Sequence, residues 1–182
     1  GGILALAVSA IVYLFACTRV IKHPILTGLF ILPLPVLLLF AIKRASGELS
    51  MSASSRWYYF VAGLRMLRYN PIVGVGINNY PKYYGEYTVA FLEYGERSAH
   101  STWVVIMSEA GLPGLTFFVA LVVLALASAW RLRLVRPELL LALVSYGVAM
   151  SFLSHTYLFL PYLLFAYIFA ARRVQRTEDE AK

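Results

Sequence analysis

Residues 112–130 read LPGLTFFVALVVLALASAW, an apolar run that carries no charge. Hydrophobic residues make up 60% of the 182-residue chain, whereas charged residues make up 14%. A soluble domain of this size could not hide so much apolar surface from water. The run is of a length typical of a membrane-spanning helix, and it predicts that this is an all-α membrane protein.

Further spans lie on both sides of this run. Apolar stretches cover residues 1–18 and 25–42, and another covers residues 139–171. As a single helix the last stretch would be about 50 Å long, which is too long for a bilayer even when tilted. We therefore expect the polar triplet at residues 154–156 to divide it, which gives about five transmembrane helices.

Basic residues indicate the orientation. They follow the first span, the 112–130 span and the last span, on one side of the membrane: Arg19, Lys22, Arg131, Arg133, Arg136, Arg172, Arg173 and Arg176. The positive-inside rule makes that side cytoplasmic. The expected order is two transmembrane helices (1–42), a long periplasmic segment with short helices (43–101), three transmembrane helices (102–171) and a cytoplasmic tail (172–182). Residues 177–182 at the end of this tail are expected to be frayed.

The long outer segment is where we expect function. One short helix is predicted over residues 57–69, ending before Asn70-Pro71, and another over residues 81–95. Gly74 and Gly76 between them predict a tight turn or a close backbone approach. One helical face carries an aromatic stripe, which suits either the lipid headgroup zone or stacking against sugar rings. Its members are Tyr80, Tyr84, Tyr87, Phe91 and Tyr94.

His100 lies at the mouth of the hydrophobic region. Its imidazole can handle protons near neutral pH at a fixed height above the bilayer, so it is a candidate catalytic group; the alternative is a capping or interface residue. No second His, Cys or Asp accompanies it in a metal-binding pattern. Glu109 is expected on the opposite helix face, where it pairs with a basic residue or satisfies backbone near the break at residues 111–114.

Four arginines of the outer segment are candidate anion ligands. Arg56 follows a serine-rich turn, and Arg65 and Arg68 are neighbours on the predicted helix. Arg97 precedes His100 by three residues. A guanidinium donates two hydrogen bonds at once to a phosphate, so these residues predict substrate binding; contact with lipid headgroups is the alternative.

These residues together resemble a known family. The order is Ser55-Arg56, an apolar helix, Asn70-Pro71-Ile-Val-Gly74-Val-Gly76, Tyr80, His100-Ser101 and then Glu109-x-Gly111-x-x-Gly114. It is similar to the C-terminal part of the O-antigen ligase and O-antigen polymerase superfamily. The resemblance identifies Arg56 and His100 with the family's functional arginine and histidine, and the glycines with Glu109 as its structural motif.

The resemblance implies that the chain is a fragment of a GT-C-like polytopic glycosyltransferase of the bacterial inner membrane. Such an enzyme transfers a glycan from undecaprenyl diphosphate to an acceptor hydroxyl at the periplasmic face, with inversion and without a metal or cofactor. The acceptor is a lipid A–core sugar in a ligase and another glycan in a polymerase. Implied partners are the donor, the acceptor and membrane lipids, and not nucleic acid. A transporter or a membrane scaffold is the non-enzymatic alternative.

Overall fold

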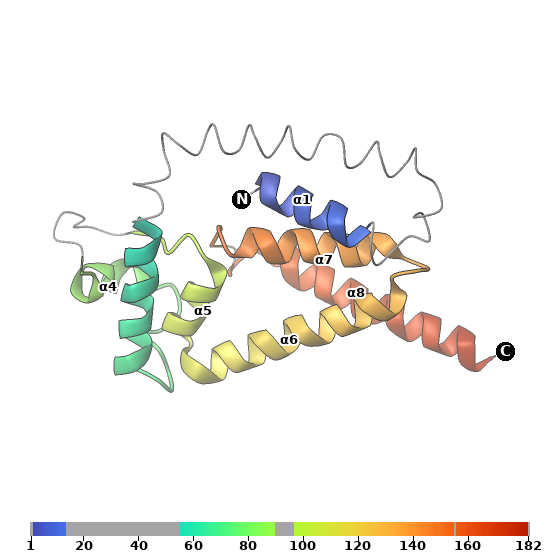
Figure 1. Cartoon of the computed structure of the whole chain (residues 1–182). Coiled ribbons are helices and arrows are strands. Elements are labelled where there is room, and N and C mark those ends of the chain that lie inside the picture. The colour runs from blue at the N-terminus through green and yellow to red at the C-terminus, as the bar shows by residue number, and fades with distance from the viewer. Residues whose placement is uncertain (1, 14–54, 90–96, 155, 182) are drawn as a thin grey trace. The chain divides into compact units, whose positions relative to one another are not determined.

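The computed structural model describes residues 2–13, 55–89, 97–154 and 156–181, and these form helices joined by turns and loops, without a strand among them (Figure 1). The predicted span at 25–42 and His155 lie outside these residues. The helices are α1 (Gly2–Val12), an unlabelled helix over residues 55–69, α4 (Tyr80–Tyr87), α5 (Thr102–Glu109), α6 (Gly111–Leu132), α7 (Pro137–Met150) and α8 (Phe159–Glu180). The all-α prediction is confirmed for the described part of the chain.

The chain divides into two compact units. One comprises residues 1–45, 121–149 and 158–182, and the other comprises residues 46–120 and 150–157. We call them the helical unit and the loop unit. The loop unit holds every candidate site residue named above, and it takes in the first ten residues of α6.

α6 confirms the predicted span at residues 112–130. Its 22 residues rise about 33 Å, close to the thickness of the hydrocarbon core. It is the one helix among the described residues that is both long and apolar enough to cross a membrane. Only 17% of its most apolar window is buried by the protein, so most of its apolar surface is left for lipid. The other four spans stay predictions.

The predicted division of residues 139–171 is also confirmed. α7 ends at Met150 and α8 begins at Phe159, so the polar triplet lies between two helices. The expectation of a frayed tail is wrong, because α8 continues to Glu180. Its last turns are held by an ion pair four residues apart, in which Arg176 Nε lies 2.7 Å from Glu180 Oε1.

Small residues mark the buried face of α6 in the helical unit. Ala125 and Ala129 of α6 are fully buried and four residues apart, which places them on one helix face. Leu140 of α7 and Ile168 of α8 are buried as well.

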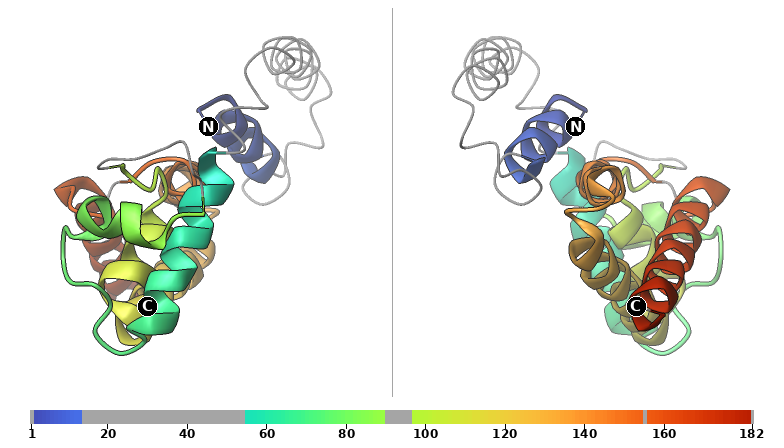
Figure 2. Two further views of the ribbon diagram at one scale, coloured as in Figure 1. Left: turned by 90° about the vertical axis from the view of Figure 1, so that its left-hand side faces the viewer. Right: turned by 90° about the vertical axis from the view of Figure 1, so that its right-hand side faces the viewer.

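The loop unit has its own core, built from the helix at 55–69, α4 and α5 (Figure 2). α5 packs in this core as a helix separate from α6, although residues 102–109 were expected to belong to the transmembrane region. The core of the loop unit is formed by Tyr59, Ala62, Met66, Tyr80, Tyr84, Ala99, Val104, Val105 and Met107.

α4 corrects the prediction of a helix over residues 81–95. It ends at Tyr87, and Thr88 has an extended backbone. Tyr80 and Tyr84 are 1% and 0% exposed, so this part of the aromatic stripe belongs to the core and reaches neither headgroups nor sugars. Phe91 and Tyr94 lie outside the described residues.

Candidate active site

The two glycine motifs form one backbone junction. Gly74 and Gly111 have φ values of +69° and +66°, which favour glycine. A Cβ on Gly74 would lie 2.4 Å from the carbonyl carbon of Glu109, and one on Gly111 would lie 2.7 Å from the carbonyl oxygen of Pro71. The N–H of Leu112 donates to that same Pro71 oxygen at 2.8 Å. The loop after the helix at 55–69 therefore docks directly onto the break between α5 and α6.

Of the other two glycines of the motifs, Gly76 lies at the same junction and Gly114 lies in the first turn of α6. Gly76 has φ +91°, and its N–H donates to the carbonyl oxygen of Glu109 at 3.1 Å. Gly114 lies in α6, where an added Cβ would lie 2.2 Å from Cβ of Ala110. Backbone contacts of Gly74, Gly76 and Gly111 thus hold the loop after the helix at 55–69 against the break between α5 and α6.

The Glu109 carboxylate ties this loop to the start of α4. Its Oε1 accepts from the N–H of Tyr80 at 2.9 Å, and its Oε2 accepts from the N–H of Asn78 at 3.0 Å. The hydroxyl of Tyr157 donates to Oε2 as well. A carboxylate at a helix N-terminus satisfies donors that have no partner within the helix. The predicted partners of Glu109, a basic residue or the backbone at the break at residues 111–114, are wrong for the described part of the chain, because the carboxylate binds the backbone of residues 78 and 80 instead.

Burial and hydrogen bonding act in opposite directions on Glu109, which is 3% exposed. Burial raises the pKa of the Glu109 carboxyl above its usual value, because it disfavours the charged form. The N–H groups of Tyr80, Asn78 and Asn79 favour the charged form and limit the rise.

His100 stands at the entrance to α5 with an unusual backbone. Its φ is +47°, in the left-handed region that residues other than glycine rarely adopt. It is exposed, and its ring centroid lies 5.8 Å from that of Tyr59. The N-cap of α5 is Ser101, so His100 does not cap that helix.

Arg56 lies in the first turn of the helix at 55–69. It is exposed, and its Cζ lies 5.0 Å from the ring centroid of Phe152, a cation–π distance. Tyr59, which contacts His100, follows one turn later, about 4.5 Å along the helix axis. Arg56 and His100 therefore both lie at the N-terminal end of the helix at 55–69, Arg56 within it and His100 against its Tyr59.

A second connection joins these two residues. Phe152 and Leu153 belong to the turn between α7 and α8, and the hydroxyl of Thr102 donates to the carbonyl oxygen of Leu153 at 2.8 Å. The segment that carries His100 is therefore bound to the turn that supports Arg56. Sequence reasoning missed Phe152 and Tyr157, and the one signal for this turn was its polar triplet.

The other arginines lie elsewhere on the loop unit. Arg97 is exposed at the start of the loop that leads to His100. Arg65 and Arg68 line a pocket at the opposite end of the helix from Arg56. Arg65 is nine residues beyond Arg56, or about 13 Å along the axis, so one phosphate could not contact both.

The match to known proteins covers this same region. A family model described as O-antigen ligase matches residues 1–119. The chain belongs to the O-antigen ligase family. No curated protein and no solved structure matches it.

Membership of the O-antigen ligase family implies a glycosyltransferase-type membrane enzyme of lipopolysaccharide synthesis, acting on a lipid-linked glycan and a polysaccharide acceptor in general terms. The matched residues include Arg56, His100, Glu109 and both glycine motifs. They end before the turn at 150–157, which supplies Phe152 and Tyr157 to the site.

Proposed function

We propose that this protein transfers a glycan from undecaprenyl diphosphate to an acceptor hydroxyl at the periplasmic face of the bacterial inner membrane, as an O-antigen ligase does. The observation that carries the proposal is the location of Arg56 and His100 at one end of the helix at 55–69. Both are water-exposed, and both lie within the residues that match the family.

In the proposed reaction the acceptor hydroxyl oxygen attacks the anomeric carbon on the face opposite the diphosphate. The new C–O bond forms as the bond to the diphosphate oxygen breaks, which inverts the anomeric centre. His100 takes the hydroxyl proton as general base. The leaving undecaprenyl diphosphate keeps the bonding electron pair, and the Arg56 guanidinium stabilises its negative charge without a metal.

Two structural features support these roles. Arg56 stacks on Phe152, which restricts a long side chain to one region, and a fixed cation stabilises developing charge better than a mobile one. The left-handed backbone of His100 is a strained conformation, and such conformations cluster at functional sites.

A glycan-transfer assay on the full-length protein tests the role of His100. His100→Ala should lower turnover by about 10²- to 10⁴-fold, the usual contribution of a general base. Lys82→Gln removes an exposed charge from the same unit and should leave transfer unchanged. Normal turnover in a well-folded His100→Ala protein would remove His100 from the mechanism. Absence of transfer by the wild-type protein would favour the scaffold or transporter alternative.

Arg56→Lys tests the arginine separately, because it retains the charge and loses the planar fork. We expect about a 100-fold lower turnover if two oxygens of the diphosphate are bound at once. Unchanged turnover would leave Arg56 with a charge or lipid-anchor role only.

A further inference from the structure

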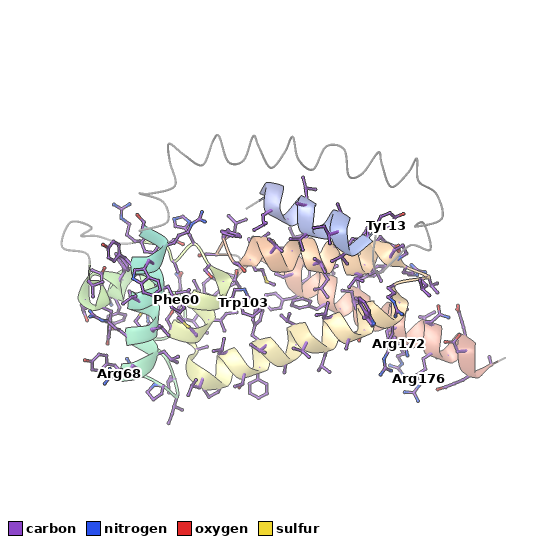
Figure 3. All side chains as sticks on the ribbon, viewed as in Figure 1. Tyr13, Phe60, Arg68, Trp103, Arg172 and Arg176 are labelled. Carbon is purple, nitrogen blue, oxygen red and sulfur yellow. The ribbon has the colours of Figure 1, made fainter. Side chains whose placement is uncertain are left out.

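A polar pocket lies at the end of the helix at 55–69 that is far from Arg56. It has a volume of about 520 Å³. Its walls come from the last turns of that helix and from the end of α4: Arg65, Arg68, Tyr69, Glu86 and Tyr87. Figure 3 labels Arg68 at this end of the helix.

The pocket carries one positive charge in excess, from two arginines and one glutamate. Arg65 and Arg68 are three residues apart and both exposed. Arg65 Nη1 donates to the carbonyl oxygen of Tyr87 at 3.3 Å, which uses one of the five donors of a guanidinium and ties Arg65 to the pocket wall. Among the described residues none accepts a hydrogen bond from Arg68. Two neighbouring guanidinium groups suit the oxygens of a phosphate.

The pocket adjoins an apolar surface at the start of α6. Tyr69, Ile72 and Val73 are 72%, 72% and 73% exposed. The loop that carries them is fixed to α6 by the hydrogen bond from Leu112 N–H to the Pro71 oxygen. The end of the helix at 55–69 and the start of α6 lie together in Figure 1. If α6 spans the membrane, this loop is at the lipid surface, where exposed tyrosines and aliphatic side chains are favoured.

We propose that this pocket binds the phosphate of an anionic lipid headgroup, with Ile72 and Val73 entering the acyl boundary beside it. The site is distinct from the Arg56–His100 site. Arg65 is two and a half helical turns from Arg56, which puts the two side chains on opposite faces as well as at opposite ends. Lipid binding in this pocket is therefore independent of the proposed transfer reaction.

Binding of short-chain lipids to the full-length protein in neutral detergent tests the proposal. Dihexanoyl phosphatidylglycerol should bind more tightly than dihexanoyl phosphatidylcholine, because only the former has a net negative headgroup. The double variant Arg65→Gln/Arg68→Gln should weaken phosphatidylglycerol binding about 25-fold, since each cation at an anionic surface contributes about fivefold. Lys82→Gln, which removes a charge outside the pocket, should change binding little.

Two further measurements make the outcome decisive. Arg68→Gln alone, which loses no hydrogen bond to a described residue, should weaken binding about fivefold in a protein whose melting temperature is unchanged. Glucose 1-phosphate should not displace the lipid. Displacement by glucose 1-phosphate would show that the pocket binds a glycan phosphate and not a lipid headgroup. If wild type and variants bind phosphatidylglycerol and phosphatidylcholine equally well, the pocket is not an anion site.

Discussion

Glu109→Ala should destabilise the loop unit more than Glu86→Ala, the exchange of the other acidic residue that the structure describes there. The carboxylate joins α5, the start of α4 and the turn at 150–157 through three donors, the N–H groups of Tyr80 and Asn78 and the hydroxyl of Tyr157. Alanine removes both acceptor oxygens, and with them all three hydrogen bonds, and it opens space that its methyl group does not fill.

The size of the effect depends on which donors water can reach. Asn78 and Tyr157 are exposed, so water replaces the lost acceptor at little cost in free energy. Tyr80 is 1% exposed, and its N–H would be left buried without a partner. That loss is about 1–3 kcal/mol. In a chain of this size each kcal/mol lowers the melting temperature by roughly 2–4 °C.

Thermal unfolding of the full-length protein in detergent, followed by intrinsic fluorescence, measures this change. Glu178→Ala is the matched control, because Glu178 is exposed on α8 and should shift the melting temperature little. Glu109→Gln should lose less than half as much, since its amide oxygen can still accept from Tyr80. Equal melting temperatures for Glu109→Ala and Glu178→Ala would refute the reasoning.

Three further predictions use the same unfolding measurement. Gly74→Ala should be strongly destabilising because of its positive φ and the 2.4 Å approach to Glu109, whereas Gly85→Ala in α4, with nothing within 4 Å of the new Cβ, should stabilise by about 0.5–1 kcal/mol. Burial raises the pKa of Glu109 in the folded state. The stabilisation that this shift contributes is therefore fully present below the pKa of the unfolded chain, and it is lost as pH rises through the pKa of the folded protein. The stability of wild type relative to Glu109→Gln should therefore fall as pH rises from about 4, and a rise would contradict the direction of the shift. His100→Gly should be more stable than His100→Ala by about 1 kcal/mol and should unfold at a higher temperature, because glycine adopts φ +47° without strain. The reverse order of melting temperatures would argue against backbone strain at this position.

Local signals were sufficient for several elements. The uncharged run at residues 112–130 predicted α6, and the residue before Pro71 predicted the end of the helix at 55–69, because both depend on neighbours in sequence. The polar triplet at residues 154–156 predicted the division into α7 and α8. In each case the chemistry of a few adjacent residues decides the structure.

Long-range contacts were beyond such signals. Nothing near Glu109 in sequence indicates that its carboxylate binds the start of α4, 29 residues earlier. The aromatic stripe illustrates the same limit, since Tyr80 and Tyr84 have the periodicity of a surface face but are covered by the helix at 55–69 and α5. The stacking of Arg56 on Phe152 joins residues from opposite ends of the loop unit, and no spacing rule links them.

The turn at 150–157 also sets an order for biosynthesis. Phe152 and Tyr157 reach Arg56 and Glu109 only after the polypeptide beyond α7 has been made, because both residues follow α7 in sequence. A nascent chain that stops after α6 would carry every motif residue and still lack the ring beneath Arg56 and the hydroxyl on Glu109. The Arg56–His100 site is therefore completed only after translation has passed residue 157.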